Sequence, residues 1–420
     1  MLKKRVVKNV LLEGNTITIN LMNHPSCITS FIRCVNLAIK RKCYDLVVEF
    51  NCEKNGIFPN ACLPISVLIQ KYRQLQGINF TINLNNKYLK HCHFESPLNL
   101  PKEEIEQLRD PLDKIFCYTK QKGQVAAIVQ AYIDFLSRNA SCEEGVLSGL
   151  IWCINEVMDN VLVHSKESEG YVMAQYHKKS KMFALCVFDC GIGIYSSLSN
   201  SEKHKPASEI DSLTMAVQEG VGDGKGQGNG LFGLYQIVSD NGGELCITSG
   251  SSSIKLKKSE LTKYEKILFF SSEHKGTIVD FKLDLSKKID LMSALKSIGG
   301  FDGFDIRIDN MFDDGNCLRY DVYENCSGTG TRLAGEELRN DVLNTIRRTQ
   351  SPLILDFKNV KACSSSFIDE LIAKMIIEIG FLKFNEYIKI ENMNSMVSHL
   401  CERSIAMRTH TAWSEISSDN

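Results

Sequence analysis

The stretch from Ile154 to Ser165 constrains the fold more than any other, because it is patterned as a helix with two different sides. At about 100° per residue, Glu156, Asn160 and His164 form one polar stripe. The opposite side carries apolar residues: Ile151, Ile154, Met158, Val161 and Leu162. We therefore expect a helix that packs its apolar side into a core and leaves its polar side facing a functional space.

The polar stripe has the chemistry of a metal-nucleotide site. Glu156 and Asn160 are four residues apart, so a carboxylate and an amide oxygen lie one above the other on the helix. The amide oxygen can enter the coordination shell of Mg²⁺, and the carboxylate can orient or deprotonate a nucleophile. On an exposed helix such a pair is usually only solvated, so the motifs around it decide between the two interpretations.

A first glycine cluster follows an apolar run. Phe183–Phe188 is expected to be a strand that ends in Asp189, with Gly191 and Gly193 in the turn after it. A carboxylate at this place can accept a hydrogen bond from the amino group of adenine, whereas guanine presents a carbonyl there. A carboxylate at this strand end therefore suits adenine better than guanine.

A second glycine cluster, Gly222–Gly230, runs into a helical pattern from Leu231 to Asp240. Backbone N–H groups of such a loop, and the N-terminus of the helix after it, can bind phosphates. The segment between Asp189 and this cluster, with a helical middle at Ser208–Gln218, is expected to form a lid over the nucleotide. Lys225 is the one cation of the glycine stretch, and it is either a phosphate contact or a solvated lysine.

Four short motifs resemble, in the same order, the N, G1, G2 and G3 boxes of the GHKL ATPase superfamily. They are Glu156-x-x-x-Asn160, Asp189-x-Gly191-x-Gly193, Gly226-x-Gly228-x-Gly230-Leu231 and Gly276-Thr277. Within that superfamily the sequence from Asn155 to Ser165 most resembles the anti-sigma-factor serine kinases, in which a Glu precedes the Asn by four residues and a His follows. The conjunction of four motifs, rather than any single one, carries the resemblance.

The resemblance implies roles for individual residues. Glu156 would be the general base and Asn160 the Mg²⁺ ligand. Asp189 would recognise adenine, and Thr277 would assist near the adenine base. The implied cofactor is therefore ATP with Mg²⁺, surrounded in addition by Gly191, Gly193, Gly226, Gly228, Gly230 and Leu231.

Other ligand-binding motifs fail on their context. Gly228–Gly233 fits G-x-G-x-x-G, but it follows a glycine loop where a dinucleotide-binding turn would follow a strand. Gly220–Gly226 is similar to a P-loop, yet Lys225 comes one residue early and precedes glycine instead of Ser or Thr. His91-Cys92-His93 would put two imidazoles on one strand face, but no further ligand is near, so we expect no metal there. The sixteen cysteines form no C-x-x-C pair and are expected to be buried free thiols.

Composition excludes some classes of partner. The chain has 49 basic and 50 acidic residues and a formal net charge of −1, which argues against general binding to nucleic acids or membrane surfaces. We find no apolar run long enough for export or for crossing a membrane. The protein is therefore expected to be cytoplasmic.

The chain is expected to form three α/β parts. Residues 1–96 alternate strand and helix patterns and resemble a degenerate STAS-type domain. Residues 97–288 would be the GHKL ATP-binding domain, an α/β sandwich with a mixed sheet, and residues 289–420 a STAS-like domain. Four strands are expected in the central sheet: Phe183–Phe188, Glu244–Ser249, Ile267–Ser271 and Gly276–Leu285. The polar Ser251–Lys266 is expected to be an exposed connection, and Phe304–Asp309 a strand of the last part.

The sequence from Leu353 to Leu371 resembles STAS-like domains and, more distantly, the anti-sigma-factor antagonists, whose strand-turn-helix carries a phosphorylatable serine. Ser365 takes that position. Ser364 stands where the antagonists have an acidic residue, and Phe367 where they have glycine. Two interpretations stay open, because serines at the start of a helix also cap its N-terminus.

The pattern as a whole predicts Mg²⁺-dependent ATP binding with transfer of the γ-phosphate, either to water or to a serine of a protein partner. The alternative is a non-catalytic switch, in which ATP alters how the STAS-like parts interact. Glu156 favours chemistry, since a pure binder needs only Asn160, Asp189 and the glycines. Relatives of such ATPases often dimerise, and by that analogy a homodimer is one expected assembly.

Overall fold

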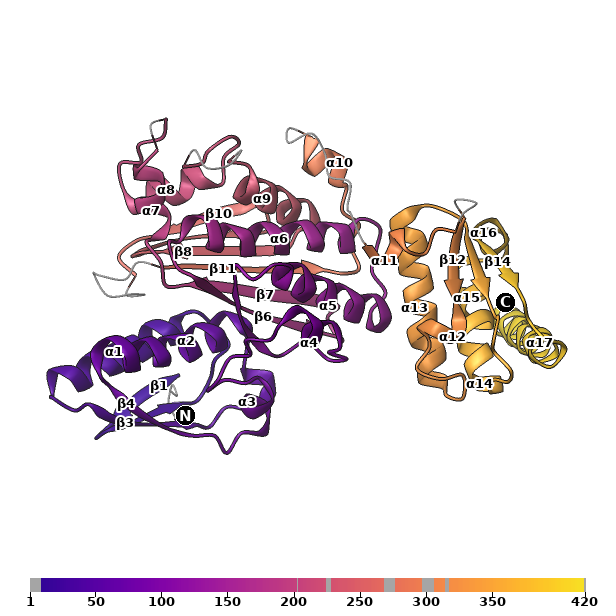
Figure 1. The fold of residues 1–420 in the computed structure, drawn as a ribbon, viewed down its shortest axis with the longest axis horizontal. Helices are drawn as coiled ribbons and strands as arrows, with labels where there is room; N and C mark the ends of the chain where they lie inside the picture. Colours follow the sequence, from indigo (N-terminus) through magenta and orange to yellow (C-terminus); the bar gives the residue numbers. More distant parts are fainter. Residues whose placement is uncertain are drawn as a thin grey trace. The chain divides into compact units, whose positions relative to one another are not determined.

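The computed structural model describes residues 9–201, 203–223, 228–267, 276–296, 306–313 and 317–418 (Figure 1). The chain divides into two compact units. The first consists of Met1–Tyr132, Gly149–Asp284 and Ile289–Phe301, and the second of Ile133–Ser148, Leu285–Lys288 and Asp302–Asn420. The three-part division expected from the sequence, at residues 96 and 288, stays a prediction.

The N-terminal part of the first unit is a four-stranded sheet with two long helices. The strands lie in the order β1 (Val10–Glu13), β2 (Thr16–Ile19), β3 (Asp45–Phe50), β4 (Asn79–Asn83). The β1–β2 pair is antiparallel, and the other two pairs are parallel because helices α1 (Ser26–Lys40) and α2 (Pro59–Gln76) connect their strands. The short helices α3 (Lys87–His91) and α4 (Lys102–Glu106) follow.

Helix α2 lies between this sheet and a larger one (Figure 1). Every residue from Pro59 to Ile69 is buried, as expected for a helix that is covered on all sides. One hydrophobic cluster joins side chains of β2, β3 and α2 to Cys186 and Phe188 in β7 and Ile278 in β11 of the larger sheet. The N-terminal residues therefore share a core with the sheet that follows them.

The larger sheet has seven strands in the order β10-β9-β8-β11-β7-β6-β5. Their bounds are Ile115–Thr119 (β5), Glu169–His177 (β6), Met182–Asp189 (β7), Glu244–Ser249 (β8), Ser252–Lys257 (β9), Glu260–Tyr264 (β10) and Thr277–Asp284 (β11). All six pairings are antiparallel, so the expected mixed sheet is wrong. Tight reversals join β6 to β7 and β8 to β9 to β10, and β11 enters between β7 and β8.

The segment Ser251–Lys266 is a hairpin of this sheet, so the connection expected there is wrong, although β10 is largely exposed as expected. Ile254 and Leu256 are buried on the sheet. The sequence looked polar because hydroxyl groups satisfy one another inside the fold: Thr248 Oγ1 donates to Ser253 Oγ at 2.8 Å. Of the strand expected at Ile267–Ser271, residues 268–271 lie outside the described residues.

The helices α5 (Gln124–Asn139), α6 (Val146–His164) and α9 (Gly230–Asn241) lie on the face of the sheet opposite α2 (Figure 1). The helices α7 (Gly193–Ser199), α8 (Glu209–Ala216) and α10 (Leu291–Ala294) complete the first unit. Among the described helices, α6 is the one long and apolar enough to cross a membrane. However, 67% of its apolar window is buried inside the fold, so packing accounts for its composition.

The second unit has three parallel strands, β12 (Leu318–Asp321), β13 (Leu353–Asp356) and β14 (Ile388–Glu391). Its helical elements are α11 (Ile306–Asp309), α12 (Val322–Asn325), α13 (Arg332–Thr349), α14 (Ser365–Ile368), a π-helical turn (Asp369–Ala373), α15 (Lys374–Ile379), α16 (Phe381–Tyr387) and α17 (Ser395–Ser418). The strand expected at Phe304–Asp309 is wrong over its described part. There the chain forms the helical turn α11, and the two terminal guanidinium nitrogens of Arg307 donate to the buried Asp341 at 2.7 and 3.0 Å.

Candidate functional site

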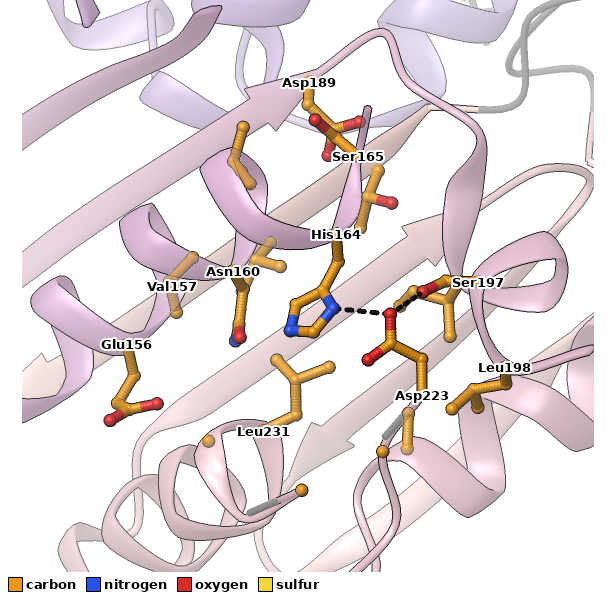
Figure 2. Close-up of a pocket in the computed structure, with 18 of the residues that line it drawn as sticks. Glu156, Val157, Asn160, His164, Ser165, Asp189, Ser197, Leu198, Asp223 and Leu231 are labelled. Atoms are coloured by element: carbon orange, nitrogen blue, oxygen red, sulfur yellow. Dashed lines mark hydrogen bonds and ion pairs between the residues drawn. The ribbon is translucent and has the colours of Figure 1, made fainter. Parts of the chain in front are cut away.

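A cavity of about 350 Å³ opens in the first unit, between α6, the end of β7, α7 and the start of α9 (Figure 2). Its volume lies in the range of about 300–1,000 Å³ that small-molecule sites occupy. It is lined by eight of the residues that the sequence singled out: Glu156, Asn160, Asp189, Gly193, Gly228, Gly230, Leu231 and Thr277. Lys225 and Gly226 lie outside the described residues.

Helix α6 presents its polar side to the cavity, as its periodicity predicts. Figure 2 shows Glu156, Asn160 and His164 along one side of the helix, and all three line the cavity. Ile154 and Met158, on the other side, are fully buried in the core. The helical pattern therefore placed these polar groups correctly relative to the core.

Asp189 lies at the end of β7 and is only 3% exposed. Its Oδ1 accepts the N–H of Gly191 at 2.8 Å, and Thr277 is its direct partner across the β7–β11 pair. Burial raises the pKa of Asp189 to about 7, and the hydrogen bonds from Gly191 and Thr277 oppose that rise. A carboxyl group is thus held at the cavity wall in a place where its ionised form is costly.

The turn after β7 is pressed against the end of α6, and this explains the glycine at position 191. A Cβ on Gly191 would lie 2.2 Å from the carbonyl oxygen of Ser165, far inside contact distance. Ile192 N–H donates to that same oxygen at 3.0 Å, and Gly276 N–H donates to the carbonyl of Gly191 at 2.9 Å. Gly191 therefore positions the turn from behind the cavity, although it does not line it.

Helix α9 begins against the acid-amide pair of α6. A Cβ on Gly230 would lie 2.5 Å from Glu156 Oε2 and 3.2 Å from Asn160 Nδ2. Burial, and to a lesser extent Asp159, raises the pKa of Glu156. The absence of a side chain at 230 thus brings a helix N-terminus next to a carboxylate and an amide.

A third group of polar side chains lines the cavity, and the sequence pattern did not predict its contacts. His164 Nδ1 donates to Asp223 Oδ2 at 2.8 Å, and Ser197 Oγ donates to the same oxygen at 3.0 Å (Figure 2). His164 was visible on the polar stripe and Asp223 in the glycine cluster. Nothing in the local sequence marked Ser197.

The segment expected to form a lid contains α7 and α8, and both are attached to the sheet. Ile194 N–H donates to Ser249 Oγ at 2.9 Å. Glu209, in the first turn of α8, accepts from the N–H and the hydroxyl of Ser251 at 2.7 and 2.6 Å. These two helices therefore belong to the wall of the cavity.

The serine row of the second unit caps a helix. Ser364 is the N-cap of α14, and its Oγ accepts the N–H of Phe367 at 3.1 Å. Ser365 is the first helical residue and is exposed. The capping interpretation is confirmed for Ser364, and phosphorylation of Ser365 stays a prediction.

The described residues contain no group of three or more His, Cys, Asp or Glu side chains placed to hold a metal ion. The strand expected at His91–His93 is wrong: His91 ends α3, and His93 has a left-handed backbone with φ of 57°. All sixteen cysteines are free thiols. A magnesium site in the cavity would thus need ligands from the nucleotide and water beside Asn160.

Comparison with known families matches the C-terminal part of the chain. Residues 334–398, from α13 into α17, match a STAS-like domain of unknown function (DUF4325). The STAS-like domain expected in this part is therefore present. No curated protein matches the chain. The family match includes no residue of the cavity.

Proposed function

We propose that the first unit binds Mg²⁺-ATP in this cavity and transfers its γ-phosphate to water or to a serine of a protein partner. The main support is that Asp189 at the end of β7 borders the same cavity as Glu156 and Asn160 of α6. The four motifs that resemble the GHKL boxes are far apart in the sequence, and a GHKL ATPase would need them around one ligand.

In this proposal Asn160 is the protein ligand of Mg²⁺, and Glu156 is the general base. The raised pKa of Glu156 suits that role, since a base works best when its pKa lies nearer the working pH. The carboxylate would align an acceptor hydroxyl or a water molecule for attack on the γ-phosphate. The start of α9 at Gly230 would supply backbone N–H groups to the phosphates.

Asp189 would accept a hydrogen bond from the amino group of adenine. In its ionised form this buried acceptor discriminates strongly, because a guanine carbonyl placed opposite the accepting oxygen would find no donor there. Thr277, the partner of Asp189 across the sheet, would hold this end of the cavity in place.

A nucleotide-dependent switch is the second candidate, and one contact favours it. Asn60 Nδ2 of α2 donates at 3.1 Å to Asp280 Oδ2 of β11, the strand that begins with Thr277. A change at the cavity end of β11 would thereby reach the N-terminal helices. If the protein is such a switch, it holds ATP without rapid hydrolysis.

Thermal unfolding with ATP, with GTP and without nucleotide tests the proposal, each with Mg²⁺. Ligand at about a hundred times its Kd should stabilise the protein by about 2.7 kcal/mol. We expect ATP to protect and GTP not to protect. Asn160→Ala should abolish the Mg²⁺-dependent part of the protection by ATP. Asn155 is a neighbour on α6 outside the cavity lining, and Asn155→Ala should behave like the wild type. Equal protection by GTP, or full protection of Asn160→Ala, would contradict the proposal.

Phosphate release separates the enzyme from the switch. Glu156→Ala should keep ATP protection and lose about 10²- to 10⁴-fold in turnover if Glu156 is the general base. Full turnover in Glu156→Ala would refute that role. A wild-type protein that binds ATP without releasing phosphate or labelling a protein serine would leave the switch as the function.

A further inference from the structure

One carboxylate in the cavity has no part in the proposed function. Asp223 comes from the second glycine cluster, and its side chain is 5% exposed. It bonds to His164 at the end of α6 and to Ser197 of α7. Three elements of the cavity wall thus meet at a single acidic side chain, inside the space that the nucleotide would use (Figure 2).

The charges of the cavity wall make this position unusual for a phosphate-binding site. Among the described residues that line the cavity, the carboxyl groups are Glu156, Asp189 and Asp223, and there is no Lys or Arg. Glu156 and Asp189 have roles in the proposed function. The negative charge of Asp223 opposes that of a polyphosphate, and repulsion between like charges is strong where little water separates them.

Two of the groups that contact Asp223 are hydrogen-bond donors suited to an anion. An imidazole N–H and a hydroxyl group converge on one oxygen, at 2.8 and 3.0 Å. A phosphoryl oxygen accepts from the same donors as a carboxylate oxygen does. In the structure the protein's own carboxylate therefore stands where a phosphoryl oxygen would fit.

We propose that His164 Nδ1 and Ser197 Oγ form an anion subsite for a phosphoryl group of the bound nucleotide, which the carboxylate of Asp223 occupies until that group displaces it. This inference rests on the proposed function, since the ligand is the same nucleoside triphosphate. It adds an internal competitor to the site, so that binding strength depends on how readily Asp223 leaves.

The described backbone that precedes Asp223 is held by close packing and a hydrogen bond, so a movement of the side chain is enough to free the subsite. A Cβ on Gly222 would lie 2.9 Å from the Cα of Gly228, which shows how closely the two ends of this loop cross. Gly220 N–H also donates to Asn229 Oδ1 at 2.9 Å. His164 and Ser197 lie on helices and would stay in place when Asp223 turns away.

Calorimetric titration of the full chain and of Asp223→Asn tests the inference, with three probes: Mg²⁺-ATP, inorganic triphosphate with Mg²⁺, and adenosine. The asparagine keeps the shape and removes the charge. We expect it to bind ATP and triphosphate about tenfold more tightly, a change of about 1.4 kcal/mol, with adenosine unchanged. Ser197→Ala should weaken ATP and triphosphate and leave adenosine unchanged. Asp240→Asn, an exposed acid near the end of α9 outside the cavity lining, is the matched control and should bind like the wild type.

Each outcome decides something. If the wild type binds ATP but Asp223→Asn binds it equally or more weakly, the internal competitor is refuted and the proposed function stands. If adenosine affinity rises together with that of ATP, the effect is not at an anion subsite, and the inference fails. If neither wild type nor variant binds ATP, the proposed function fails and takes the inference with it. Asp223→Ser, which also removes the charge, repeats the test should Asp223→Asn be unstable.

Discussion

The buried carboxyl group of Asp189 gives the sharpest prediction, because its ionisation should make the first unit less stable as pH rises. In the folded protein its pKa is raised from the ordinary 3.8 to about 7 by burial. The protonated group therefore stabilises the fold at low pH, and this contribution is lost as pH rises through about 7. At 1.36 kcal/mol per pKa unit, the full contribution is about 4 kcal/mol.

Asp189→Asn removes this dependence, because the amide cannot ionise. As pH rises from about 5 to about 8, about 3 kcal/mol of this stabilising contribution is lost from the free energy of unfolding. Over that interval the wild type should therefore lose about 3 kcal/mol of unfolding free energy relative to the variant. Asp280, whose pKa is also raised by burial, to about 6, is present in both proteins and cancels.

Denaturant unfolding followed by tryptophan fluorescence measures this difference. The chain has two tryptophans, and Trp413→Phe leaves Trp152, which lines the cavity, as the reporter of the first unit. Unfolding curves of this background and of its Asp189→Asn derivative are compared at both pH values. A difference between the two proteins that does not change with pH would refute the burial argument for Asp189.

Three further predictions concern single side chains. Gly230→Ala should weaken ATP binding at least about tenfold in calorimetry, because its Cβ would lie 2.5 Å from Glu156 Oε2. Asp341→Asn should destabilise the second unit by about 1.5–3 kcal/mol in denaturant unfolding, since it removes the negative charge that accepts two hydrogen bonds from the largely buried Arg307 and leaves Asp134 as a weaker ion-pair partner. Asp280→Asn should stabilise the first unit at about pH 8 and not at about pH 4. The pKa of Asp280 is raised, so the stabilising contribution of its protonated form is lost as pH rises through about 6. Equal effects on the free energy of unfolding at both pH values would contradict this.

Much of the local structure was predictable because it depends on short-range periodicity. The apolar repeat that places Glu156 and Asn160 on one side of α6 needs only a helix of 3.6 residues per turn. The apolar run before Asp189 likewise predicts a strand with the carboxylate at its end. The strand in Ser251–Lys266 escaped prediction because the buried hydroxyl of Ser253 pairs with that of Thr248 on the neighbouring strand, which a polar sequence does not reveal.

The sequence alone determined which groups are polar, which helix side they share and which strand end carries a carboxylate. Tertiary structure decided what lies beside them. Thr277 is opposite Asp189 only because β11 enters the sheet next to β7, and Ser197 reaches Asp223 only because α7 packs beside the glycine cluster. Periodicity reports the direction of a side chain relative to its own element. The choice of neighbouring strand and of hydrogen-bond partner depends on contacts between residues far apart in the chain, which no local pattern contains.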